Sequence, residues 1–129
     1  MGEGSGRAVR VLVVDDDPDS LVTLSLLLRG EGYEVRMLRR GAEVPRVVAE
    51  FNPDAVLLDI GMPDRGGHEL AQELVERYGA KCPVLIALTA HASDADREMA
   101  EISGFHYFLP KPYDPGRLLR LLGILKRSG

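Results

Sequence analysis

The chain has 129 residues, the length of one ordinary domain, and its 45% of hydrophobic and 28% of charged residues are typical of a soluble globular protein. Its formal net charge is −4 and its arginines are scattered, so we expect no direct binding to nucleic acid, which needs a basic face. A single cysteine cannot form an internal disulfide, and no apolar run reaches the roughly 18 residues of a membrane span, so we expect a cytoplasmic protein without a membrane contact.

Short apolar runs alternate with longer amphipathic stretches over residues 8–127, which we expect to form one domain after a flexible leader of residues 1–7. In chain order the predicted elements are a strand over Val9–Val14, a helix from Pro18 to about Gly30, a strand over Tyr33–Leu38, a helix after Gly41 through Phe51, a strand over Ala55–Leu58, a helix over His68–Tyr78, a strand over Val84–Leu88, a helix from an N-cap at Ser93 to about Ser103, a strand over Tyr107–Leu109 and a helix over Leu118–Leu125. Several of the apolar runs lack polar alternation, which is typical of strands buried on both faces. Five successive β-α units predict a parallel sheet with helices on both faces.

Polar side chains follow four of the five predicted strands. They are Asp15, Asp16 and Asp17 after the first strand, Asp59 after the third, Thr89 after the fourth and Lys111 after the fifth. Parallel strands bring their carboxyl ends to one edge of the sheet, where the ligands of such folds bind. Carboxylates that crowd together raise one another's pKa unless a cation is present, and a cluster of this size suits Mg²⁺.

This edge therefore predicts a phosphoryl-transfer site. Asp59 is the expected nucleophile and would form an acyl phosphate. Lys111 and a metal ion would balance the phosphoryl oxygens, and the Thr89 hydroxyl would donate to one of them. Asp17 is expected to start the helix at Pro18 rather than to bind metal.

Four segments resemble the motifs of response-regulator receiver domains, in the same order and at the same intervals. They are Val11-Leu-Val-Val-Asp-Asp-Asp-Pro18, Leu57-Leu-Asp-Ile-Gly-Met-Pro63, Ala87-Leu-Thr-Ala90 and Lys111-Pro112. The resemblance covers about residues 8–125 and implies a (βα)5 doubly wound parallel five-stranded sheet in the flavodoxin-like order 2-1-3-4-5. It also implies a phosphoacceptor domain of a two-component phosphorelay rather than an enzyme. The implied partners are a histidine kinase or histidine phosphotransfer protein and an unknown output partner, with the domain itself a monomer or weak dimer.

The family's metal site is carried over onto four matching positions. Asp59 matches the phosphoacceptor, and Asp15 and Asp16 match the acidic pair that holds Mg²⁺ or Mn²⁺. Gly61 matches the position whose backbone carbonyl is a further metal ligand.

The resemblance also assigns the phosphoryl-binding and switch residues. Thr89 and Lys111 match the hydroxyl and the lysine that bind the phosphoryl group, and the bond from Lys111 to Pro112 is expected to be cis. Phe108 matches the aromatic switch position, which turns inward in the family when Thr89 moves toward the phosphoryl group. The first helix has apolar residues beyond one stripe, and the family suggests that its surplus is a docking face for a helical phosphodonor.

Some positions depart from the family or carry no predicted chemistry. After Met62-Pro63 many relatives read Gly-Met-Asp-Gly, whereas residues 64–67 here are Asp-Arg-Gly-Gly, which leaves the flexibility and partner fit of this loop open. Gly61 and His91 are expected to tune the lifetime of the phosphoryl group. The three histidines at 68, 91 and 106 share no metal-ligand spacing and are expected at the surface or in loops.

Two other functions compete with the phosphoacceptor. Asp15-x-Asp17 after a strand also fits an aspartate-nucleophile phosphatase of the haloacid dehalogenase type, although Asp19 stands where that family has Thr or Val. An EF-hand calcium loop fails, because Ser20 replaces its glycine and Leu26 its closing glutamate. A phosphorylation-independent interaction module with the same fold stays open.

Overall fold

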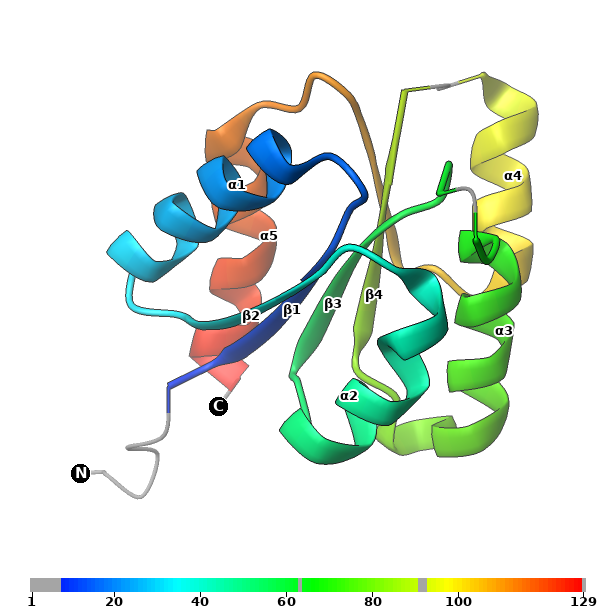
Figure 1. The fold of residues 1–129 in the computed structure, drawn as a ribbon, viewed down its shortest axis with the longest axis horizontal. Helices are drawn as coiled ribbons and strands as arrows, with labels where there is room; N and C mark the ends of the chain where they lie inside the picture. The colour runs from blue at the N-terminus through cyan, green and yellow to red at the C-terminus, as the bar shows by residue number, and fades with distance from the viewer. Residues whose placement is uncertain (1–7, 63, 91–92, 129) are drawn as a thin grey trace.

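The computed structural model describes residues 8–62, 64–90 and 93–128, so the predicted leader lies outside the described residues. In chain order the elements are β1 (Arg10–Val14), α1 (Pro18–Gly30), β2 (Glu34–Leu38), the short 3-10 helix η2 (Gly41–Glu43), α2 (Val44–Phe51), β3 (Ala55–Asp59), α3 (Gly67–Tyr78), the short 3-10 helix η3 (Gly79–Lys81), β4 (Val84–Thr89), α4 (Asp94–Ser103), β5 (Tyr107–Pro110) and α5 (Pro115–Ser128). The strands pair in parallel in the order β2-β1-β3-β4-β5, which confirms the predicted fold (Figure 1). Within the described ranges, no helix combines the length and apolar character needed to cross a membrane.

Alternate residues of each strand enter two separate hydrophobic cores, one on each face of the sheet. In β1, Val11 and Val13 pack in the core formed with α1 and α5, whereas Leu12 and Val14 pack in the core formed with α2, α3 and α4. Figure 1 shows these two helical layers on opposite sides of the sheet. All four side chains are fully buried, which explains why the β1 sequence shows no polar alternation.

Local hydrogen bonds set where α1 and α4 begin. The Asp17 side chain accepts a hydrogen bond from the Asp19 N–H, with 3.2 Å between Oδ1 and N, so Asp17 caps α1 as predicted. Ser93 caps α4, also as predicted, through a reciprocal pair of bonds with Asp96 at 3.1 and 3.3 Å.

The last helix begins earlier than predicted. α5 starts at Pro115, whereas the apolar periodicity suggested a start at Leu118. The Gly116 N–H donates to the Asp114 side chain at 3.0 Å, and the Leu118 N–H donates to the Asp114 carbonyl at 3.2 Å. A proline is well suited to a first helical turn because the N–H that it lacks would have no partner there. The prediction was wrong because the first turn of α5 carries no apolar side chain to mark it.

Candidate functional site

The register of β1 and β3 brings two carboxylates together. Val14 pairs with Leu58, so the residues that follow them, Asp15 and Asp59, lie side by side at the carboxyl ends of the strands. These two residues are only 2% and 8% exposed. Buried carboxylates repel each other and are costly to desolvate, so this edge of the sheet requires positive charge.

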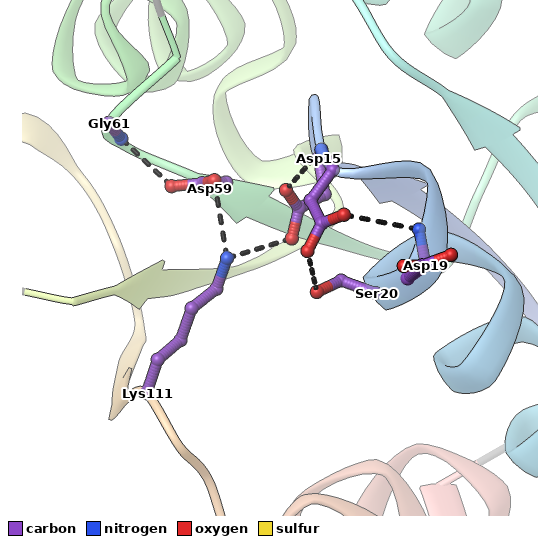
Figure 2. A network of polar contacts seen from close by, with 7 residues as sticks. Asp15, Asp19, Ser20, Asp59, Gly61 and Lys111 are labelled. Atoms are coloured by element: carbon purple, nitrogen blue, oxygen red, sulfur yellow. Dashed lines mark hydrogen bonds and ion pairs between the residues drawn. The ribbon is translucent and has the colours of Figure 1, made fainter.

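Lys111 supplies one positive charge to this edge. The backbone N–H of Lys111 donates to the backbone carbonyl of Thr89 at the end of β4, with an N–O distance of 2.7 Å. The peptide bond from Lys111 to Pro112 is cis, as predicted. The ammonium group donates to Asp15 Oδ2 at 2.8 Å and to Asp59 Oδ2 at 3.2 Å, as Figure 2 shows. Thus one lysine bridges the two buried carboxylates.

A third carboxylate completes an acidic cluster. Ligand oxygens of Asp15, Asp16 and Asp59 all lie within 4.8 Å of one another, and Asp16 is the exposed member. Backbone amides orient the two buried ones: the Asp17 N–H donates to Asp15 Oδ1 at 3.0 Å, and the Gly61 N–H donates to Asp59 Oδ1 at 2.9 Å. Three hard oxygen donors around a single ammonium group carry excess negative charge, so the cluster fits a divalent cation such as Mg²⁺ or Mn²⁺.

The pKa values of Asp59 and Lys111 reflect their burial together with the charges around them. Burial raises the pKa of Asp59 above its ordinary value, and the negative charge of Asp15 adds to the rise, which the Gly61 N–H and Lys111 only partly offset. Burial alone would lower the pKa of Lys111, but its hydrogen bond to Asp15 and the charges of both carboxylates outweigh burial and raise this pKa. Lys111 is therefore held in its charged form, while Asp59 takes up a proton more readily than an exposed carboxyl group.

Thr89 and Phe108, the predicted switch residues, lie on the same face of the sheet. Phe108 of β5 pairs with Ala87 of β4, so the side chains of these two residues point to the same side of the sheet. Thr89 is two residues beyond Ala87, and its side chain therefore points to that side as well. Thr89 is 3% exposed and Phe108 is 8% exposed. The Arg97 guanidinium of α4 lies over the Phe108 ring, with its Cζ 5.2 Å from the ring centroid.

Two of the histidines make contacts that the sequence did not suggest. His68 is half-buried rather than on the open surface, and its Nδ1 lies 2.9 Å from Ser103 Oγ. His106 is exposed, but its Nδ1 accepts a hydrogen bond from the Leu85 N–H at 2.9 Å. His91, predicted to tune the phosphoryl lifetime, lies outside the described residues.

Sequence reasoning missed the role of one carboxylate in the loop that follows Asp59. Asp64 accepts hydrogen bonds from the backbone amides of Gly41 and Ala42, 23 and 22 residues earlier in the chain. The only signal at this position was the departure of the loop from the family pattern, and that pattern gives no indication of a partner so far away in the sequence.

Comparisons with known sequences agree on one family. The model of the response regulator receiver domain matches residues 11–123. The chain is 38% identical over 112 residues to the "Uncharacterized 14.6 kDa protein in sodA1 3′ region" of Leptolyngbya boryana, which covers 87% of this chain and 86% of that protein. It is 34% identical over 120 residues to the DNA-binding response regulator MtrA of Mycolicibacterium smegmatis, which covers 92% of this chain and 51% of that protein. The chain thus spans about half the length of the curated response regulators that it matches.

Solved structures give the same result. A CheY-like response regulator receiver domain protein from Methanospirillum hungatei superposes with a TM-score of 0.85 at 26% identity, over 95% of this chain and all of that one (100%). A chain of the co-crystal structure of the Saccharomyces cerevisiae histidine phosphotransfer protein Ypd1 and the receiver domain of Ssk1 superposes with a TM-score of 0.80 at 25% identity, over 86% of this chain and 83% of that one. Receiver domains are signalling domains of two-component systems. By its sequence motifs, its strand order and these matches, this chain belongs to the response regulator receiver domain family.

Proposed function

We propose that the domain is a phosphorylation-dependent switch in a cytoplasmic two-component phosphorelay, and that Asp59 accepts a phosphoryl group from a histidine kinase or a histidine phosphotransfer protein. The observation that carries the proposal is the contact of Lys111 with both Asp15 and Asp59, which are 96 and 52 residues away in the chain. Burying two carboxylates and a lysine together brings little stability, so such a cluster calls for a chemical role.

The transfer would be a direct displacement at phosphorus. A carboxylate oxygen of Asp59 forms a bond to phosphorus while the bond from phosphorus to the donor imidazole nitrogen breaks. The imidazole leaves with the electron pair and takes up a proton. The product is an acyl phosphate whose negative oxygens the Lys111 ammonium and the Thr89 hydroxyl would bind. Attack by water on this acyl phosphate would later restore Asp59 and release phosphate.

Four residues would hold the divalent cation. Asp15, Asp16 and Asp59 would contribute carboxylate oxygens, and Gly61 its backbone carbonyl. The excess of carboxylates over ammonium groups supports this assignment, as does the orientation of Asp15 and Asp59 by backbone amides. When bound, Mg²⁺ or Mn²⁺ would neutralise negative charge on the phosphoryl oxygens.

Thr89 and Phe108 would pass the signal to the surface formed by α4, β5 and α5. Both residues are buried on one face of the sheet, so a shift of Thr89 toward a phosphoryl group changes the space beside the Phe108 ring. Arg97, which lies over this ring, and Arg117 both line a surface depression of about 210 Å³. Repacking of Phe108 would change the shape and charge of this depression, and an output partner would recognise the change.

A helical phosphodonor would dock on α1, next to the entrance of the site. Val22 and Leu26 are one helical turn apart and are 51% and 64% exposed. A depression of about 580 Å³, lined by Ser20, Lys111 and Tyr113 among others, lies beside the acidic cluster. The Ypd1–Ssk1 co-crystal structure, which pairs a histidine phosphotransfer protein with a receiver domain, supports this kind of partner.

Intact-protein mass spectrometry after incubation with acetyl phosphate and Mg²⁺ tests the proposal. Wild-type protein should gain one phosphoryl group, EDTA should prevent the gain, and the Asp59→Asn variant should gain none. Asp54→Asn is the matched control and should be phosphorylated like the wild type, because Asp54 lies at the opposite end of β3 and accepts a hydrogen bond from the Arg10 N–H at 2.8 Å. Wild-type protein that gains no phosphoryl group would overturn the proposal.

The same protein samples separate the competing functions. Continuous release of phosphate from a free phosphate ester would favour an aspartate-nucleophile phosphatase over a phosphoacceptor. Absence of a phosphoryl group, together with an intact fold, would favour the phosphorylation-independent interaction module.

A further inference from the structure

One carboxylate, that of Asp64, connects the loop between β3 and α3 to the segment that follows β2. Asp64 Oδ1 accepts the Gly41 N–H at 3.1 Å, and Asp64 Oδ2 accepts the Ala42 N–H at 2.9 Å. Both amides belong to the start of η2, directly after β2 and its connecting turn. We call these two hydrogen bonds the Asp64 contact. They lower the pKa of Asp64, the Ala42 bond more than the Gly41 bond, because donated N–H groups stabilise the charged carboxylate.

The neighbouring Arg65 connects the same loop to helix α3. Its guanidinium donates to Glu69 at 2.7 Å and to Glu73 at 2.8 Å, both on α3. Gly41 lies directly against this segment, because a Cβ built there would be 2.9 Å from Leu70 Cδ1 and 3.2 Å from Arg65 Cβ. The loop is therefore packed against η2 as well as hydrogen-bonded to it.

The other end of the loop is the site itself. The Gly61 N–H donates to Asp59 Oδ1 at 2.9 Å. A Cβ on Gly67 would lie 2.6 Å from the Ile60 Cα, so the chain folds back tightly on itself between Asp59 and α3. Asp64 is only three residues after Gly61 in the chain, so the Asp64 contact limits the positions open to the Gly61 peptide.

We infer that Asp64 is a positioning residue for phosphoryl acceptance, acting through the backbone of Gly61, whose amide orients Asp59 and whose carbonyl would bind the metal ion. This inference rests on the proposed function. In the wild type the Asp64 contact holds residue 64 against η2. Without this contact, residue 64 would lose more conformational freedom when the cation binds at Gly61, and the cation would bind more weakly. The Asp-Arg sequence that departs from the family pattern thus has a role here.

The Mg²⁺ dependence of phosphorylation tests this role. The rate of phosphorylation of Asp59 by phosphoramidate is measured against Mg²⁺ concentration for the wild type, Asp64→Ala, Asp64→Asn and Asp54→Ala. Asp64→Ala should raise the half-maximal Mg²⁺ concentration by about tenfold, the lower end of the range for residues that orient metal ligands. Asp64→Asn keeps one acceptor oxygen and should fall between Asp64→Ala and the wild type.

Asp54→Ala is the control for a merely structural effect. Asp54, like Asp64, accepts a backbone amide from a distant segment, but at the opposite edge of the sheet. It should lose stability and keep the wild-type Mg²⁺ dependence. Amide hydrogen exchange at Gly61 should accelerate in Asp64→Ala and stay unchanged in Asp54→Ala.

Two results would overturn the inference, and a third would separate it from the proposed function. An unchanged Mg²⁺ dependence in Asp64→Ala overturns it, and so does an equal increase in Asp54→Ala, which would point to general destabilisation. If wild-type protein accepts no phosphoryl group, the proposed function fails on its own, and the same four proteins are compared by Mn²⁺ binding in electron paramagnetic resonance. Weaker Mn²⁺ binding in Asp64→Ala alone would then support the positioning role, and equal binding would overturn it.

Discussion

Replacing Asp59 by asparagine should stabilise the domain when no divalent cation is present, although it removes the nucleophile. Asparagine has nearly the same shape and can keep the hydrogen bond from the Gly61 N–H to the position of Oδ1. What it removes is a buried charge and the acceptor of the longer of the two Lys111 hydrogen bonds, while Lys111 keeps its bond to Asp15 at 2.8 Å. The sign of the effect therefore depends on whether the surroundings of Asp59 favour or oppose that charge.

The distances allow the opposing interactions to be compared. With an effective dielectric constant of about 20, Lys111 at 3.2 Å attracts the Asp59 charge by about 5 kcal/mol, and Asp15 within 4.8 Å repels it by about 3.5 kcal/mol or more. Asp16 is exposed, so its repulsion is closer to the value in water, about 1 kcal/mol. These contributions nearly cancel, which leaves the desolvation of the carboxylate to decide the sign. We expect Asp59→Asn to raise the free energy of unfolding by about 1 kcal/mol, at the low end of the cost of burying a polar group.

The pH dependence gives an independent check of the sign. Burial raises the folded-state pKa of Asp59 above its ordinary value of 3.8, so the folded state binds this proton more tightly than the unfolded state. Wild-type stability relative to the variant is then highest below 3.8 and falls as pH rises through the folded-state pKa. The advantage of Asp59→Asn should be full at pH 7 and should shrink as pH falls toward 4.

Thermal unfolding followed by circular dichroism measures the effect. In EDTA at pH 7, Asp59→Asn should melt roughly 4 °C above the wild type, since 1 kcal/mol shifts the melting temperature of a domain this size by about that much. Saturating Mg²⁺ should reverse the order, because the cation stabilises only the protein that binds it well, by about 2.7 kcal/mol at 100 times its dissociation constant. Asp64→Asn is the control of opposite sign: hydrogen bonds lower the pKa of Asp64, so its contribution to stability is present above 3.8 and is lost as pH falls. An Asp59→Asn variant that is no more stable than the wild type in EDTA would refute the reasoning.

Three further predictions concern stability and reactivity. Leu28→Ala should reduce the free energy of unfolding by about 2–5 kcal/mol because Leu28 is fully buried, whereas Leu26→Ala on the same helix, 64% exposed, should change it by less than about 0.5 kcal/mol; urea denaturation of both variants compares them. Ser93→Ala should cost about 1 kcal/mol by removing the acceptor for the Asp96 N–H at the start of α4, and equal denaturation midpoints for variant and wild type would contradict this. Burial raises the pKa of the Cys82 thiol, so iodoacetamide at pH 8 should modify it more slowly in the folded protein than in urea, which mass spectrometry can follow over time.

Much of the fold could be predicted from the sequence because its signals are local. Apolar runs without polar alternation mark strands that are covered on both faces, and Asp17 and Ser93 mark helix starts through bonds to residues two or three positions away. The parallel arrangement of β-α units then brings all strand ends to one edge. This is why the convergence of the acidic residues, Thr89 and Lys111 could be predicted before any contact between them was known.

The tertiary structure decided which of the converging residues touch and how they are charged. The register of β1 against β3 sets Asp15 beside Asp59, and burial, to which the charge of Asp15 adds, gives Asp59 a raised pKa. The Asp64 contact joins segments more than 20 residues apart, which no periodicity or cap can indicate. Sequence spacing determines interactions within a helical turn or a strand, whereas contacts between distant segments depend on register and packing, which exist only once the whole sheet is assembled.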